Sequence, residues 1–299
     1  MPRWLVWCVL ALLFFGGWAV APKTLPREVP GVESQALSTI GVLPILAVLC
    51  FSKNLRSGNA RLRGAAIAFV AGLLMVAGNI FYYEALSHEK AMTVTPLTAL
   101  YPLVTVALAL VFLREKPHAL QVCGIGVALA AMFIFGLDLN KGDSLQGMAD
   151  WRSIAEYVLL PICLWGVAGL LQKLSTNYAS SDLSTFWFQA APLPAAVILF
   201  ARGYVGLSHS PREWLGFLLI GLLLGLGNLA LIASFGSGGK ASIVTPLSGL
   251  YSVVAIPLAM LFGERAGKRE VGVIALALIA VVLLSWERRK ETGNVGQTS

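Results

Sequence analysis

Ten stretches of about 18 to 23 residues are almost entirely apolar, and short segments with charged or turn-forming residues separate them. They cover residues 4–21, 35–52, 64–86, 91–113, 118–137, 154–173, 183–201, 213–234, 241–262 and 269–286. A helix needs roughly 20 apolar residues to cross the hydrocarbon core of a bilayer. With 57% hydrophobic and 12% charged residues, the chain also lacks the charges that cover a soluble fold. The sequence therefore predicts an all-α polytopic membrane protein with ten transmembrane helices.

The first apolar stretch has two interpretations. Arg3, the apolar run and the ending Ala19-Val20-Ala21 fit a cleavable secretory signal. However, Phe15-Gly16 stands 150 residues before Trp165-Gly166, in the sixth stretch. This match indicates that the first stretch is a counterpart of the sixth, so we expect it to be a retained helix.

The segment KAMTVTPLTALYP at 90–102 returns as KASIVTPLSGLYS at 240–252, with eight of thirteen residues identical. Other landmarks recur at a spacing of 149 or 150 residues: Gly78-Asn79 with Gly227-Asn228, Thr95-Pro96 with Thr245-Pro246, Tyr101 with Tyr251, and Glu115 with Glu264. Such a unit holds five predicted helices, and an odd number of crossings inserts the second copy upside down. We expect two inverted five-helix repeats, 4–137 and 152–286, a polar linker at 138–151 and a tail at 287–299.

Basic residues in the connecting segments give a weak orientation signal. The first long loop, between the second and third stretches, contains Lys53, Arg56, Arg61 and Arg63. Lysine and arginine are enriched in cytoplasmic loops, so we expect both termini in the cytoplasm. The net charge of +7 is then expected to meet lipid headgroups of the bilayer, and no nucleic acid partner is expected.

These landmarks resemble the EamA-type carriers of the drug/metabolite transporter superfamily over residues 4–286. The resemblance rests on Phe15-Gly16, Trp165-Gly166, the two KAxxVTPLxxLY segments, and Glu115 and Glu264. One departure is an arginine at position 114, where the second copy has a glycine. The resemblance implies a secondary carrier that binds no cofactor and moves a small organic metabolite, often an amino-acid-like solute and often outwards, by alternating access. It further implies a location in a bacterial inner membrane and a central cavity between the third, fourth, eighth and ninth helices. The resemblance is compatible with either a monomer or a homodimer.

Polar residues at matching positions of the two repeats are the first candidates for substrate binding. Asn79 and Asn228 lie within apolar stretches, where a side-chain amide either faces a wet cavity or bonds to a neighbouring helix. Tyr101 and Tyr251 follow the two Thr-Pro pairs by about two helical turns. Their phenols can donate hydrogen bonds to a polar solute or pack against a carbonyl.

Three further residues are weaker cavity candidates. Trp165 lies near the middle of its stretch, where its ring can stack on a solute or pack against a glycine. Thr95 and Thr245 precede prolines, and we expect their hydroxyls to bond back into their own helices.

Ionisable residues in or beside the apolar stretches are candidates for other roles. Glu84 is a carboxylate inside the third stretch, so it is a candidate coupling group, or it reaches headgroup water from the end of its helix. Lys23 and Lys173 match each other in the two repeats. They either attract an anionic part of the solute or extend to the interface with their stems along lipid.

Two rival classes of membrane protein fit ten apolar stretches. An intramembrane enzyme needs converging acids, histidines or a nucleophile with its base. His88, His118 and His209 lie in or beside loops, so we expect neither an enzyme nor a metal site. The other alternative is a lipid flippase or a non-transporting membrane protein, which would not export water-soluble metabolites in a saturable way.

Overall fold

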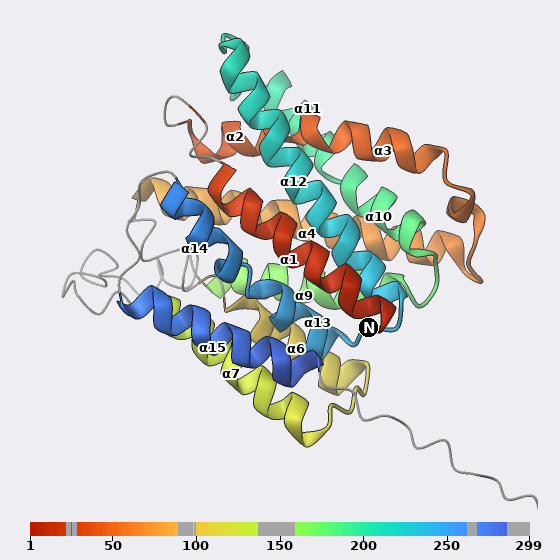
Figure 1. Ribbon diagram of the computed structural model, residues 1–299. Helices are drawn as coiled ribbons and strands as arrows, with labels where there is room; N and C mark the ends of the chain where they lie inside the picture. Colours follow the sequence, from red (N-terminus) through yellow and green to blue (C-terminus); the bar gives the residue numbers. More distant parts are fainter. Residues whose placement is uncertain are drawn as a thin grey trace, which may run out of the picture.

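The computed structural model describes residues 1–21, 25, 29–88, 98, 100–136, 159–261 and 268–285, and every regular element in these ranges is helical (Figure 1). In the first half the elements are α1 (Arg3–Val20), α2 (Gly31–Ser38), the 3-10 helix η2 (Thr39–Val42), α3 (Leu43–Cys50), the 3-10 turn η3 (Lys53–Arg56), α4 (Arg61–His88), α6 (Tyr101–Phe112) and α7 (Ala119–Gly136). In the second half they are α9 (Leu160–Ser175), α10 (Ser181–Ala190), α11 (Pro192–Ala201), α12 (Pro211–Gly236), α13 (Ala241–Gly249), α14 (Ser252–Leu261) and α15 (Lys268–Ser285). The all-helical prediction is confirmed, while the predicted linker and tail lie outside the described residues.

Several predicted helices consist of two shorter helices. The second stretch is divided into α2, η2 and α3, and the seventh into α10 and α11. Prolines 44 and 192 stand in the first turns of α3 and α11, where a missing N–H and a fixed φ are compatible with a helix start. The ninth stretch divides into α13 and α14 after Leu250, whose ψ of 20° leaves the helical range.

Six helical segments among the described residues are long and apolar enough to cross a bilayer. They are Arg3–Val20, Val32–Cys50, Arg61–Tyr82, Ser181–Ala201, Pro211–Gly236 and Ala241–Leu258. Shorter apolar helices occupy Tyr101–Phe112, Ala119–Ala131, Leu160–Ser175 and Ile274–Ser285. Large apolar side chains such as Val48, Val111 and Leu215 point away from the bundle and are well exposed. Such an apolar exterior needs lipid around it, so the chain is a multi-pass membrane protein.

The two halves contact each other in a reciprocal way. Helix α1 packs along α12, and α4 packs along α9. Gly16 of α1 lies against Val254 and the carbonyl of Tyr251, and Gly166 of α9 lies against Val104 and the carbonyl of Tyr101. Each residue of the first contact stands 150 positions away from its counterpart in the second contact. Equivalent residues of the two halves thus make equivalent contacts, and α7 and α15 pair at one edge of the bundle (Figure 1).

One face of helix α1 packs into the bundle, while Val6, Trp7 and Leu13 on its other face are exposed. It crosses the middle of the view in Figure 1, between α12 on one side and α13 and α14 on the other. Cys8 and Ala11 are fully buried in the largest apolar core, together with Phe235 of α12 and Val244 of α13. Removal of the first stretch as a signal would empty this core, so the packing supports a retained helix.

Arg114 holds an unusual backbone conformation at the end of α6. Its φ is 52°, a left-handed conformation that costs a residue with a Cβ roughly 1 kcal/mol. The next residue, Glu115, donates its N–H to the carbonyl of Ala109, which closes the helix as glycine-containing caps do. The second copy has a glycine at the position matching Arg114.

Arg114→Gly is therefore expected to raise the apparent melting temperature of the purified protein by about 2 °C, because it relieves this strain. The measurement is thermal unfolding in detergent. Arg202→Gly is the matched control: Arg202 is exposed and right-handed, with φ of −85°, so no increase is expected there. A lower melting temperature for Arg114→Gly would contradict the strained cap.

Candidate functional site

A small polar cavity lies between α2 and η2 of the first half, α10 and α11 of the second, and the long helices α4 and α12. Its volume is about 40 Å³, which holds on the order of three water molecules. Its polar lining consists of Gln35, Ser38, Thr39, Asn79, Gln189 and Asn228. No charged side chain lines it among the described residues.

Glycines bring the surrounding backbones together and thereby create this cavity. Gly221 of α12 lies against the carbonyl of Ser38 and against Gly41, and Gly72 of α4 lies against the carbonyl of Phe188 and against Ala191. The residues of one contact are again the counterparts, 149 or 150 positions away, of the residues of the other. Because glycine lets backbones approach closely, η2 meets α12 and α10 meets α4 directly. The polar side chains on either side then face a shared space.

This position differs from the one that the family resemblance implied. We expected a cavity between the third, fourth, eighth and ninth helices, and the cavity seen in the described residues lies between the second, third, seventh and eighth. The close approach through Gly72 and Gly221 explains why the second and seventh helices form its walls. Residues 89–97 of the fourth predicted helix, which include Thr95, lie outside the described residues.

The structure brings Asn79 and Asn228 to the same cavity. Nδ2 of Asn79 donates to Oε1 of Gln35 at 2.9 Å, and Nδ2 of Asn228 donates to the carbonyl of Leu224 in its own helix at 3.0 Å. Nε2 of Gln189 donates to the carbonyl of Gly225 at 2.8 Å. Both interpretations of Asn79 thus hold at once, because it lines a cavity and also bonds to a neighbouring helix.

Gln35 and Gln189 were not predicted as site residues. At a spacing of 150 residues Gln35 matches Thr185, and Gln189 matches Thr39. A search for identical residues in the two repeats therefore passes over both glutamines. The signal that was available is an amide within an apolar stretch, the same signal that identified Asn79.

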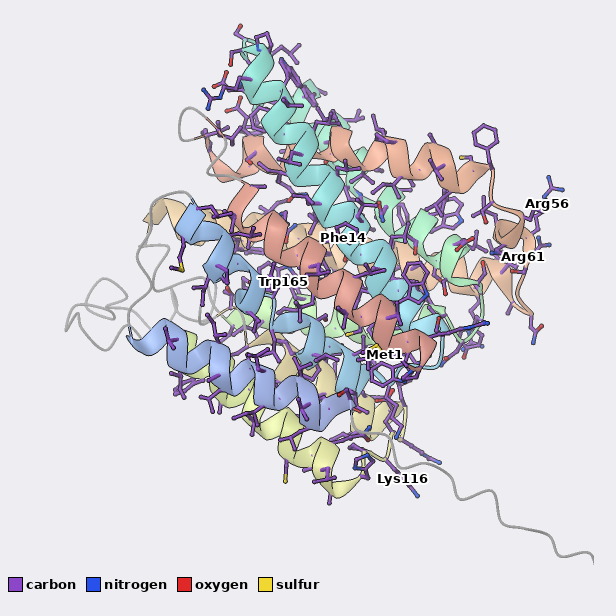
Figure 2. All side chains as sticks on the ribbon, viewed as in Figure 1. Met1, Phe14, Arg56, Arg61, Lys116 and Trp165 are labelled. Atoms are coloured by element: carbon purple, nitrogen blue, oxygen red, sulfur yellow. The ribbon has the colours of Figure 1, made fainter. Side chains whose placement is uncertain are left out.

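The aromatic candidates form a separate group on another side of α4. The ring of Trp165 contacts Tyr82 at a centroid distance of 5.4 Å and Tyr101 at 5.9 Å, and it packs against Gly78. Its Nε1 donates to the carbonyl of Met75 at 3.3 Å. Trp165 is half-buried, and its label lies near the centre of the view in Figure 2. The described contacts therefore hold Trp165 by packing against glycine and tyrosine.

Tyr101 and Tyr251 both stand at interruptions of their helices. Leu100 lies in a turn and α6 begins at Tyr101, while Tyr251 separates α13 from α14. Trp18 meets the ring of Tyr251 edge-on at a centroid distance of 6.4 Å. Paired interruptions of this kind in the two repeats of a carrier typically surround a binding site, since they leave backbone groups unpaired.

Glu115 connects the two halves at one end of the bundle. Its Oε1 accepts the N–H of Ala241 at 2.8 Å, and its Oε2 accepts the N–H and the hydroxyl of Ser242 at 2.8 and 2.6 Å. These groups start α13, where unpaired N–H groups and the helix dipole favour a carboxylate. Glu115 therefore braces more than its own turn, because it holds the buried helix α13 of the other repeat.

The prediction that the hydroxyl of Thr245 bonds back into its own helix was wrong. Its side chain is only 2% exposed, and Oγ1 has no hydrogen-bond partner among the described residues instead of bonding back into α13. The carbonyl of Thr245 accepts a hydrogen bond from the hydroxyl of Ser248 at 3.0 Å.

Nζ of Lys173 donates to the carbonyl of Phe235 near the end of α12, at 3.0 Å. Lys23 and the side chain of Glu84 lie outside the described residues.

Two carboxylates close the ends of the region around the polar cavity. Near the start of α2, Glu33 accepts the N–H of Gly206 at 3.0 Å and lies 3.1 Å from Nε2 of His209. Near the start of α10, Asp182 accepts hydrogen bonds from Ser52 and from Nδ2 of Asn54. Glu33 and Asp182 match each other at a spacing of 149 residues. Each one ties a helix start of one half to a loop of the other.

Comparisons with known proteins agree with a two-repeat membrane carrier. The model of the EamA-like transporter family matches residues 2–137 and again residues 153–286. The uncharacterised transporter YojE of Bacillus subtilis is 25% identical over 257 residues, which are 82% of this chain and 80% of YojE. An uncharacterised protein of Methanocaldococcus jannaschii is 26% identical over 129 residues, 43% of this chain and 93% of that protein. A crystal structure with 16% identity superposes with a TM-score of 0.72, covering 94% of this chain and 96% of that one.

The fold and these matches define a multi-pass helical transporter with two like halves. The chain belongs to the EamA-like transporter family, within the drug/metabolite transporter superfamily.

Proposed function

We propose that the protein is a secondary transporter of a small organic metabolite, an exporter of amino-acid-like or related solutes, which works by alternating access. The observation that carries the proposal is the break between α13 and α14 at Tyr251, together with the start of α6 at the matching residue Tyr101 in the other repeat. In two-repeat carriers such interruptions lie where substrate binds. The tyrosine hydroxyls, with Trp165 beside them, then offer hydrogen bonds and an aromatic surface to the solute.

We further propose that residues 4–137 and 152–286 are inverted five-helix repeats with ten crossings in total. The reciprocal contacts of α1 with α12 and of α4 with α9 support an exchange of equivalent positions between the halves. The polar cavity, with a volume of only about 40 Å³, is too small for a metabolite, since pockets for such ligands measure roughly 300 Å³ or more. We propose that this arrangement represents a closed state and that rocking of the halves opens a larger space.

The proposed location is a bacterial inner membrane with both termini in the cytoplasm. Figure 2 shows Arg56, Arg61 and Lys116 towards the same side of the view as Met1. A concentration of basic residues at the end that holds the N-terminus favours a cytoplasmic position for that end. A small-molecule substrate and the lipid bilayer are the proposed partners, and dimerisation is a matter for measurement in a bilayer.

The test is efflux from proteoliposomes. Purified protein is reconstituted in liposomes loaded with a defined mixture of amino acids, nucleosides and sugars, and mass spectrometry follows the contents over time. We expect saturable loss of a chemically related subset, in contrast to protein-free liposomes. Equal loss of every compound, or loss only of fluorescent lipid from one leaflet, would contradict the proposal, and the second result would indicate a flippase.

A further inference from the structure

One buried amide of the polar cavity has an unused acceptor. Gln189 is 3% exposed, and its Nε2 is bonded to the carbonyl of Gly225. This bond determines which end of the amide is nitrogen, because a carbonyl can only accept. The opposite atom, Oε1, has no hydrogen-bond partner among the described residues. An unpaired buried carbonyl costs about 1–3 kcal/mol, so its retention points to a partner outside the described residues.

The two asparagines of the cavity repeat this arrangement. Asn79 and Asn228 each direct Nδ2 to a protein oxygen, at 2.9 and 3.0 Å. Within the described residues, the Oδ1 atom of neither side chain accepts a hydrogen bond. Three amides from α4, α10 and α12 thus turn a nitrogen to the protein and leave an oxygen for a ligand.

The hydroxyls of the cavity have also used their protons. Ser38 and Thr39 both donate to the carbonyl of Gln35, each at 3.1 Å. A hydroxyl that donates elsewhere can offer only its lone pairs to a ligand. Together with the three amide oxygens, this gives the polar part of an otherwise mostly apolar lining five oxygen acceptors without formal charge.

We propose that this acceptor-lined cavity binds the hydrogen-bond-donating end of the transported solute: a primary amide, a hydroxyl or an ammonium group. A carboxylate or phosphate would place its oxygens against Oε1 of Gln189 and the asparagine oxygens, with no cation to compensate, and such an arrangement is unfavourable. The volume admits about three non-hydrogen atoms, so only the end group enters the closed state. The proposal rests on the proposed transport function and narrows its substrate class.

Formamide and formate test the proposal directly, because they have the same size but only formamide can donate a hydrogen bond. Thermal unfolding of the full-length protein in detergent is measured with about 100 mM of either compound, and with methylammonium to compare a cationic donor. We expect formamide or methylammonium to raise the melting temperature by about 2 °C more than formate does. Equal effects of all three compounds on the wild-type protein would overturn the proposal.

Gln189→Leu removes the unpaired acceptor and is expected to abolish the advantage of the donors over formate. Asn177→Leu, in an exposed turn after α9, is the matched control and should retain it. If Gln189→Leu does not purify as a folded protein, Asn228→Leu takes its place with the same expected result. A donor advantage that persists in Gln189→Leu, or in Asn228→Leu where that variant replaces it, would overturn the assignment to this cavity.

These results separate the cavity from the transport function. Saturable efflux together with equal effects of formamide and formate would leave the transporter intact and reject the donor-binding site. A donor advantage without any efflux would keep the binding site and reject transport. Each measurement therefore decides its own claim.

Discussion

Gly221→Ala is expected to destabilise the protein strongly, because a Cβ at this position would overlap the backbone carbonyl of Ser38 and approach Gly41. Neither neighbour is a flexible side chain, so η2 and α12 would have to move apart along their contact. Overpacking of this severity costs about 3 kcal/mol, a large share of the 5–15 kcal/mol by which proteins are typically stable. The measurement is the yield of monodisperse protein and its melting temperature.

Gly126→Ala is the matched control for this prediction. Gly126 lies in the middle of α7, and a Cβ there meets no atom within 4 Å. Alanine exceeds glycine in helix propensity by about 1 kcal/mol, so this variant should fold at least as well as the wild type. A wild-type melting temperature for Gly221→Ala would show that η2 and α12 do not touch in the native protein.

The double substitution of Asn79 and Asn228 by leucine is expected to abolish efflux from proteoliposomes while the protein stays folded. Leucine has a similar volume, but it removes two of the four side-chain amides that line the cavity and makes the space more apolar. The structural loss is modest, since a hydrogen bond between membrane helices contributes on the order of 1 kcal/mol. Efflux of the loaded metabolites and gel filtration of the purified variant are the two readouts.

Asn177→Leu is again the control, because it changes an exposed asparagine outside the cavity and should leave efflux at the wild-type rate. Undiminished efflux by the double variant would exclude Asn79 and Asn228 from the transport path. A variant that loses both efflux and its gel-filtration peak would instead assign the two asparagines a structural role.

The apolar stretches and the internal repeat predicted the elements of this protein well, because both depend on local properties. A run of about 20 apolar residues is stable in a bilayer only when its backbone is paired internally, so it predicts a helix wherever it lies. The repeat spacing also matched Asn79 with Asn228 and Tyr101 with Tyr251, and the structure places the two asparagines in the lining of one cavity. The family that these landmarks resembled is confirmed.

Tertiary contacts decided which helices surround the polar cavity and which groups remain free in it. Gly72 and Gly221 bring the second and seventh helices against α4 and α12, and hydropathy contains no information on that approach. Gln35 and Gln189 were not predicted because the matching residue in the other repeat is a threonine in both cases. Whether an amide oxygen is free, as in Gln189, depends on where a carbonyl of another helix lies. Hydrophobicity acts without direction and can be read along the chain, whereas hydrogen bonds are directional and depend on groups distant in sequence.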